Sequence, residues 1–382
     1  MLPLVLAFAG ISIDGELLFP IEKVHNHAST VVELPNGDLF TVWYRGSGER
    51  TADDVDVRFS RLAKGGKSWT PPRVIADTPH FPDCNPAVFV DSARKLWLLW
   101  PVIMANEWHT ALMRYSISSD YKNPAAPPRW EHSGIITFIP RNFAAKVQDV
   151  LGPAVSKAEP GSRAASYLKN VVERSKDKYF SRMGWMTRAH PVELSSGRII
   201  VPLYSDGYSF SIMAITDDGG KTWTSSEPLV GYGAIQPSIA RKKDGTLVAY
   251  MRDNGPAPKR LQVSQSTDDG ITWSPAADSD LPNPGAGAEV INLRDGSWAL
   301  IYNDTEKGRD SLAVAISDDE GLSWKWKRRL EQQPGGSFHY PSLIQARDGS
   351  LHASYSYFMP EGKSIKHARF TVDWVKQGDP RP

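Results

Sequence analysis

The hydrophobic residues of this 382-residue chain gather in short runs that follow turn-forming residues. Six runs share one layout, in which a turn opens an apolar segment that ends on an aromatic or polar residue; they occupy residues 36–44, 94–100, 196–204, 244–252, 295–302 and 348–355. A further apolar run precedes each turn. Strand, tight turn and strand in this order predict a series of antiparallel β-hairpins.

A second repeat lies between these hairpins. Its copies are TDDGGKTW at residues 216–223, STDDGITW at 266–273 and SDDEGLSW at 317–324. Their closing tryptophans recur about every fifty residues, a period typical of solenoids, propellers and arrays. Asp and Gly favour a tight turn, and Trp returns the chain to the core. We therefore interpret Asp217, Asp268 and Asp318 as turn residues on the far face, and exclude them from catalysis.

These repeats predict an all-β fold, a six-bladed β-propeller that forms a single domain from residue 1 to residue 382. The spacing breaks once, at residues 139–183, where apolar residues recur at helical spacing. This segment is predicted to be a helical insertion between blades two and three. Residues 11–19 are predicted to pair with residues 365–370 and to close the ring.

The first residues of the chain allow two interpretations. Residues 1–9 are apolar and contain a small-residue pattern, which fits either the remnant of a signal peptide or a first buried strand. A remnant implies a periplasmic or secreted protein, whereas a buried strand leaves a cytoplasmic location open. No apolar stretch approaches the length of a membrane span.

The composition excludes several classes of function. The net charge is only +1, so the strongly basic composition typical of a nucleic-acid-binding protein is missing. Cys84 is the only cysteine, so an internal disulfide is excluded. No cluster of ligating residues has metal-binding spacing, and we expect neither a metal nor another cofactor. Aromatic residues make up 10% of the chain, which suits β-structure or a surface that stacks on sugars.

Antiparallel strands bring the residues that open the first strand of each blade and close the second to one end of the ring. The main candidates there are His27, Arg45, Asp53, Asp54, Asp83, Asn85, Arg188, Gln236, Arg252, Glu289, Arg309, His339 and Tyr340, with His25, Glu49, His190 and Asp206 beside them. Several arginines at one mouth suit an anionic ligand. The carboxylates, histidines and tyrosine supply acid, base and nucleophile for glycoside chemistry.

These repeats and residues resemble the sialidase (neuraminidase) superfamily, whose hallmark turns they share, and the chain is similar to its divergent branch. The resemblance covers the chain outside residues 139–183. It implies that Arg252 and Arg309 hold the carboxylate of an acidic sugar, and that Tyr340, in the YPSL stretch at residues 340–343, is the nucleophile. Asp53 or Asp54 would be the acid that protonates the leaving oxygen.

Two positions depart from the family pattern. The arginine that completes the carboxylate clamp of the family is absent, because His27 opens the equivalent stretch, so Arg45 or Arg188 would supply the third charge. The glutamate that activates the tyrosine is replaced by Gln236, which cannot take a proton, and Glu289 would substitute for it. Asp83, Asn85 and His339 are expected to bind substrate, together with His27 and Gln236.

The sequence therefore predicts an exo-acting glycoside hydrolase that removes a terminal acidic sugar, foremost an α-linked sialic acid. Its partner would be an acidic glycan or a sialoglycoconjugate. Two alternatives stay open: a hydrolase or lyase that acts on a uronic-acid glycan, and a glycan-binding propeller without turnover.

Overall fold

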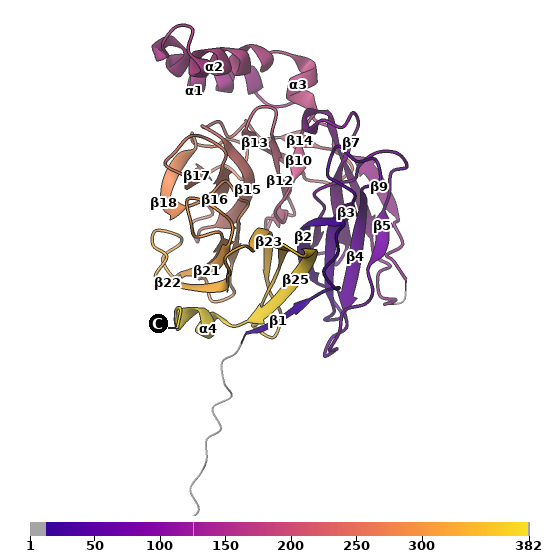
Figure 1. Ribbon diagram of the computed structural model, residues 1–382. Helices are drawn as coiled ribbons and strands as arrows, with labels where there is room; N and C mark the ends of the chain where they lie inside the picture. Colours follow the sequence, from indigo (N-terminus) through magenta and orange to yellow (C-terminus); the bar gives the residue numbers. More distant parts are fainter. Residues whose placement is uncertain (1–12, 125, 381–382) are drawn as a thin grey trace, which may run out of the picture.

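The chain forms the expected six-bladed β-propeller. The computed structural model describes residues 13–124 and 126–380. Their strands form six sheets, and Figure 1 looks onto the ring that these sheets build. The inner strands contact one another around the axis, β2 against β6 and β23, and β15 against β19.

The first three blades hold the strands up to β14. Blade one comprises β2 (His25–Glu33), β3 (Leu39–Gly46), β4 (Asp56–Leu62) and β5 (Arg73–Ala76). Blade two comprises β6 (Ala87–Val90), β7 (Leu96–Ile103), β8 (Ala111–Ser118) and β9 (His132–Ile135), with a 3₁₀ turn η1 (Trp108–Thr110). Blade three comprises β10 (Met186–Thr187), β11 (Val192–Glu193), β12 (Ile199–Ser205), β13 (Phe210–Thr216) and β14 (Thr224–Ser225).

The last three blades complete the ring. Blade four comprises β15 (Ala234–Arg241), β16 (Leu247–Asp253), β17 (Arg260–Ser266) and β18 (Ala277–Pro282). Blade five comprises β19 (Glu289–Asn292), β20 (Trp298–Tyr302), β21 (Ser311–Ser317) and β22 (Trp326–Gln332). Blade six comprises β23 (Ser337–Gln345), β24 (Leu351–Met359), β25 (Gly362–Phe370) and β1 (Asp14–Leu17), and helix α4 (Val372–Lys376) follows it.

The ring closes where the two ends of the chain meet. β1 pairs antiparallel with β25, with Asp14 opposite Arg369 and Leu17 opposite Lys366. This pairing confirms the predicted closure for the residues that the structure describes, and Figure 1 shows β1 beside β25. Residues 1–9, which the sequence predicts to be either a signal-peptide remnant or a first buried strand, lie outside the described residues.

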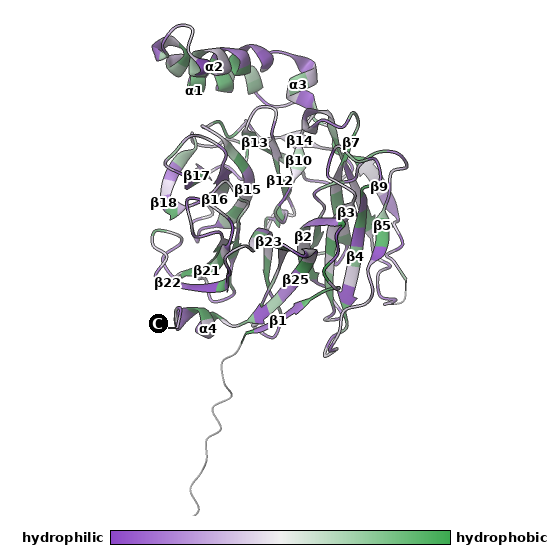
Figure 2. Ribbon diagram, in the orientation of Figure 1, coloured by the Kyte–Doolittle hydropathy of each residue, from purple (hydrophilic) through white to green (hydrophobic). Residues whose placement is uncertain are grey.

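The hydrophobic core lies between neighbouring blades. Val42 and Phe59 of blade one pack with Leu98 and Trp100 of blade two in one cluster of buried residues. Similar clusters join blades four and five, and blades five and six. Figure 2 shows hydrophobic colour along the strands of the ring. Because each blade buries its two faces against its neighbours, strands that read as continuous apolar runs are stable only within the ring.

The repeated Asp–Gly turns join the third and fourth strands of blades three, four and five. In the turn after β17, Asp268 accepts hydrogen bonds from the hydroxyls of Ser266 and Thr272, at 2.8 and 2.6 Å, and from the Thr272 amide at 2.9 Å. The Gly270 amide donates to the Ser266 hydroxyl. The equivalent carboxylates are Asp218 and Asp319, whereas Asp217 and Asp318 pair with Arg198 and Lys325.

Replacing Asp268 with alanine is expected to destabilise the propeller by about 1–2 kcal/mol, because the turn loses an acceptor similar to a helix cap. Urea unfolding monitored by tryptophan fluorescence measures this change. Thr267→Ala, at an exposed position in the same turn, is the matched control. An Asp268→Ala variant as stable as the control would show that the carboxylate does not hold the turn.

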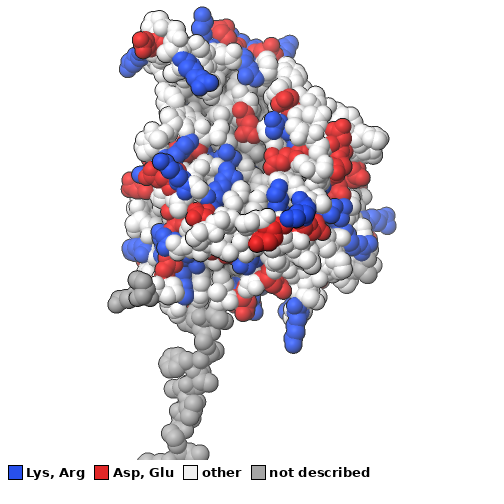
Figure 3. Space-filling model, viewed as in Figure 1, with Lys and Arg blue, Asp and Glu red and all other residues white. Residues whose placement is uncertain are grey.

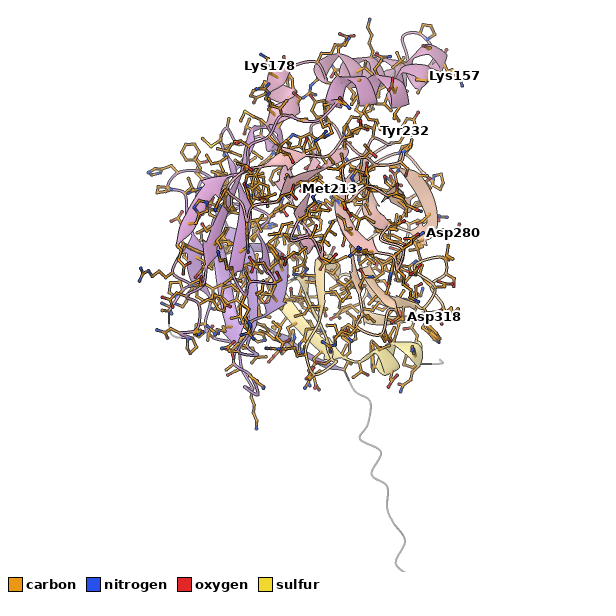
Figure 4. All side chains as sticks on the ribbon, turned by 180° about the vertical axis from the view of Figure 1, so that it is seen from behind. Lys157, Lys178, Met213, Tyr232, Asp280 and Asp318 are labelled. Carbon is orange, nitrogen blue, oxygen red and sulfur yellow. The ribbon has the colours of Figure 1, made fainter. Side chains whose placement is uncertain are left out.

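Three helices interrupt the ring between β9 and β10. They are α1 (Phe143–Lys157), α2 (Arg163–Arg174) and α3 (Lys178–Arg182). Phe143, Val147 and Leu151 of α1 are buried in the cluster that contains the strands of blades two and three. The helices therefore lie at the outer edge of the ring (Figure 1), and from behind Lys157 and Lys178 mark them above it (Figure 4). Within the described residues, no helix has the length and apolar character that a bilayer span requires.

Candidate functional site

Three inner strands carry the same irregularity at one end of the ring. β2, β15 and β23 each shift register, between His27 and Thr30, between Ile235 and Ser238, and between His339 and Ser342. The residue at each shift has a positive φ: Ala28 at 56°, Gln236 at 56° and Tyr340 at 45°. Bulges of this kind re-aim side chains, and strained backbone of this kind is concentrated at functional sites.

Tyr340 lies at the centre of this end. Its phenolic oxygen accepts hydrogen bonds from Gln236 Nε2 and from Arg252 Nη1, both at 3.1 Å. Its ring stacks on His27 with centroids 4.5 Å apart and an angle of 18°. A β-carbon on Gly287 would lie 3.1 Å from the Tyr340 ring, so a glycine leaves the ring its space. Donors at the oxygen would stabilise negative charge that develops there.

Arg252 and Arg309 approach Tyr340 from blades four and five. The Arg309 guanidinium lies 5.9 Å from the Tyr340 ring centroid, and its Nη2 donates to the carbonyl of Gly285 at 2.6 Å. Arg252 also donates from Nη2 to Asn254 Oδ1 at 3.4 Å. Each Nη carries two hydrogens, so both guanidiniums keep donors for a ligand carboxylate. The structure therefore brings together the two arginines to which the sequence assigned carboxylate binding.

His339 and His27 are neutral histidines beside these cations. Burial, and then the charges of Arg309, His25, Arg252 and Lys363, lower the pKa of His339 to about 3. Arg309 Nη1 donates to His339 Nδ1 at 2.6 Å, so the other nitrogen carries the proton and faces Ser337 Oγ at 2.6 Å. Burial, and then the neighbouring His339 and His25, also hold the pKa of His27 well below its usual value.

His25, Lys363 and Glu49 form a polar chain at the rim. Lys363 Nζ donates to His25 Nδ1 at 2.7 Å, which leaves His25 Nε2 to donate to Glu49 Oε1 at 3.2 Å. Tyr44 donates to the same oxygen at 2.9 Å. Burial alone would raise the pKa of Glu49, but these hydrogen bonds outweigh it and the pKa is lowered. Lys363 thus adds a cation on the blade-one side, where the family arginine is absent.

Arg188 and Glu289 lie deeper along the axis. The Arg188 guanidinium lies 5.0 Å from the Tyr340 ring centroid and donates to the carbonyls of Ser29 and Pro341. Glu289 accepts from the amide and Nδ1 of His190, both at 2.8 Å, and from the Leu343 amide at 2.6 Å. It lines a cavity of about 450 Å³ that also contains residues near the opposite end of the ring. The structure therefore does not bring Glu289 to the Tyr340 oxygen.

The other predicted groups of blade one, on β3 and in the loop that follows it, make contacts of their own. Arg45 Nε pairs with Glu22 at 3.0 Å. Asp54 accepts from the amide and hydroxyl of Ser47, which closes the loop. Asp53 is exposed and accepts from Asn106 Nδ2 at 2.9 Å. Arg45 and Asp54 are thus committed to local contacts, and Asp53 faces solvent.

Asp83 and Asn85, at the start of blade two, have different surroundings. Asp83 accepts from the Thr78 amide and from Trp100 Nε1, and burial, opposed by these hydrogen bonds, raises its pKa to about 6. Asn85, with a φ of 39°, donates to the Tyr204 hydroxyl at 3.2 Å. Gln236 keeps its Oε1 buried without a hydrogen bond within the described part of the chain. Asn85 and Gln236 therefore border the site, whereas Asp83 is held within blade two.

The arrangement suits an anionic ligand with a reactive centre above Tyr340. Arginines from blades three, four and five surround the phenol, and His27 stacks on its ring. Figure 3 shows basic and acidic side chains interspersed over the face of the ring. Sequence reasoning missed Lys363 because it considered only the first two strands of each blade, and Lys363 belongs to β25, the third.

Comparison with known proteins identifies related sequences. The model of the BNR repeat-like domain family matches residues 37–145 and 170–353, more than half of the chain. A sialidase of Bacteroides fragilis (strain YCH46) is 23% identical over 360 residues, 88% of this chain and 59% of that protein. An anhydrosialidase of Macrobdella decora is 26% identical over 202 residues, 48% of this chain and 26% of that protein. The chain thus spans less than two thirds of either relative.

Solved structures share the propeller. The leech intramolecular trans-sialidase in complex with 2,7-anhydro-Neu5Ac has a TM-score of 0.71 at 14% identity, over 96% of this chain and 72% of that one. The intramolecular trans-sialidase from Ruminococcus gnavus has a TM-score of 0.67 at 15% identity, over 94% and 96% of the two chains. A protein of unknown function from Dyadobacter fermentans DSM 18053 gives 0.69 at 16%, over 94% and 99%. At these identities the likeness concerns the fold.

Proposed function

Because this chain belongs to the BNR repeat-like domain family, we propose that it is an exo-acting glycoside hydrolase of sialidase type. Its substrate would be a glycan that ends in an acidic sugar, foremost an α-linked sialic acid. The curated relatives include a sialidase and an anhydrosialidase, which supports this class of reaction.

The observation that carries the proposal is the contact between Arg252 and the Tyr340 oxygen at 3.1 Å, with Arg309 beside the same ring. A carboxylate held by Arg252 and Arg309 places the adjoining anomeric carbon next to the phenol. Tyr340 would then stabilise the oxocarbenium-like centre as the glycosidic bond breaks, or attack it through its oxygen while its phenolic proton passes to water. A phenol suits this task because it adds no second negative charge beside the sugar carboxylate.

A second candidate reaction is elimination across a uronic-acid residue. One observation favours it: His27 is neutral and stacked on Tyr340, while Gln236 occupies the place of a proton acceptor. His27 could take the proton that an elimination removes, but burial, which lowers its pKa, makes it a weak base. Elimination leaves an unsaturated sugar that absorbs in the ultraviolet, whereas hydrolysis does not, so absorbance during digestion of a uronic-acid glycan separates the two reactions.

The direct test of the proposal is release of sialic acid from sialyllactose. Arg309→Lys keeps the charge but loses the planar fork, and we expect it to raise KM by about 10- to 100-fold, the loss of a charged hydrogen bond. Arg198→Lys, on a side chain paired with Asp217 at the turn end, is the matched control. Saturable binding of sialyllactose without release would instead identify a glycan-binding propeller.

A further inference from the structure

The loop after β12 brings a carboxyl group to the mouth of the ring. Asp206 follows Ser205, the last residue of β12. The charged groups that act on it are, in decreasing order, Arg252, Arg50 and Glu49. The same loop contacts the candidate site directly, because Asn254 Nδ2 donates to Ser209 Oγ at 3.3 Å. Arg252, which donates to the Tyr340 oxygen, also donates to Asn254 Oδ1 at 3.4 Å.

The helical insertion supports this loop. The Tyr208 hydroxyl donates to the carbonyl of Arg174, near the end of α2, at 2.8 Å. Arg174 in turn donates to the carbonyl of Gly207 at 3.5 Å. The buried ring of Tyr208 packs against Phe143 of α1 with centroids 5.1 Å apart. Asp206 is therefore carried by a loop that is anchored on packed helices.

Asp206 differs from the neighbouring carboxyls in having no committed partner. Within residues 13–124 and 126–380 its carboxyl makes neither a hydrogen bond nor an ion pair. By contrast, Asp53 accepts from Asn106, Asp54 from Ser47, and Glu49 from Tyr44 and His25. An uncommitted carboxyl at the mouth is available to donate its proton to a ligand oxygen.

We propose that Asp206 is the general acid of the hydrolysis, an assignment that rests on the function proposed above. As the bond between the anomeric carbon and the glycosidic oxygen breaks, its electron pair goes to that oxygen. The oxygen takes the proton of the Asp206 carboxyl, which is left as a carboxylate. Water then adds its hydroxyl to the anomeric carbon, and the remaining proton of that water returns to Asp206.

The surroundings of Asp206 agree with this role. Burial raises the pKa of Asp206 against the opposing charges of Arg252 and Arg50, and Glu49 adds to the rise. Tyr204 lies on β12, two residues before Asp206, and His109 and Arg174 lie against Gly207. A raised pKa keeps the carboxyl protonated to higher pH, as a proton donor requires. The pKa of Asp54 is instead lowered, first by the Ser47 amide.

The experiment compares two sialosides with different leaving groups. An aryl sialoside whose leaving group is an acidic phenol needs little help from an acid, whereas sialyllactose needs a proton. Asp206→Asn is expected to lower kcat/KM for sialyllactose by about 10²–10³-fold, but for the aryl sialoside by less than about tenfold. The alkaline limb of the wild-type pH profile should also disappear in the variant. Asp217→Asn, on the far rim, is the matched control.

The outcomes separate the assignment from the proposed function. Equal losses on both sialosides, or no loss on either, overturn the role of Asp206. A substrate-dependent loss in Asp53→Asn, with none in Asp206→Asn, would give the proton to Asp53 instead. A folded wild type that is inactive towards both sialosides removes the proposed hydrolysis itself, and the assignment falls with it.

Discussion

Replacing Tyr340 with phenylalanine is expected to lower kcat on an aryl sialoside by about 10⁴-fold, with little change in KM. The ring that stacks on His27 at 4.5 Å and lies 5.0 Å from the Arg188 guanidinium is retained. The oxygen that accepts from Gln236 and Arg252 is lost. Because those donors remain, the carboxylate of the sugar can still bind while the anomeric centre loses its partner. Initial rates of phenol release at saturating and limiting substrate measure both constants.

Tyr167→Phe provides the matched control for this prediction. Tyr167 lies on α2 with 50% of its surface exposed, so the same substitution removes an oxygen without touching the site. Thermal unfolding of both variants checks that the fold persists, since Arg252 and Gln236 lose an acceptor at a cost of about 1–3 kcal/mol. A Tyr340→Phe enzyme that turns over at the wild-type rate would exclude the phenolic oxygen from the reaction.

The repeated turns made the architecture predictable. Each hairpin turn and each Asp–Gly repeat is a local motif whose own residues determine its conformation. Asp268, for example, needs only Ser266 and Thr272 from its own turn to be satisfied. When such local motifs repeat at a regular spacing, they predict the order and number of strands without knowledge of any long-range contact. The same reasoning marked residues 139–183 as different, because helical spacing replaced the strand pattern.

The directions of the site side chains were harder to predict. A strand alternates its faces, but the bulges at Ala28, Gln236 and Tyr340 add residues out of step and reverse that alternation. A signal was present at two of these positions, since Pro237 and Pro341 follow directly. Proline has no amide hydrogen for the ladder and is confined to edges and bulges. Such a residue on an inner strand indicates a bulge.

The sequence did not predict the hydrogen-bond and ion-pair partners that come from distant parts of the chain. Arg45 meets Glu22, which comes from the segment that leads into the first blade. Arg188 is held by carbonyls of two other blades, at Ser29 and Pro341. The sequence placed Arg45 and Arg188 at one end of the ring, but their partners depend on how six sheets meet. A shared mouth was therefore predictable, and the assignment of each charge within it was not.

Glu289 is the predicted catalytic residue whose surroundings are most clearly those of a structural link between blades. Its carboxylate joins His190 of blade three to the Leu343 amide of blade six, and only 2% of its surface is exposed. Glu289→Gln puts an amide donor where the carboxylate accepts from two sides. Breaking a buried pair in this way is expected to destabilise the propeller by about 3–5 kcal/mol. Urea unfolding measures this loss, with Glu159→Gln, exposed between α1 and α2, as the matched control.

The pH dependence of this loss identifies the ion pair as its cause. Burial would lower the pKa of His190, but Glu289 outweighs it and the pKa lies above the usual 6.5. The contribution of protonated His190 to the free energy of unfolding is therefore present below pH 6.5, and it is lost as pH rises through the raised pKa. Burial would raise the pKa of Glu289, but His190 and the backbone amides outweigh it, and the pKa lies below 4.5. The contribution of the Glu289 carboxylate to the free energy of unfolding is therefore present above pH 4.5, and it is lost as pH falls through the lowered pKa. The stability difference between wild type and Glu289→Gln should be largest between pH 4.5 and 6.5. A variant of wild-type stability whose kcat falls about 10²–10⁴-fold would instead make Glu289 the base.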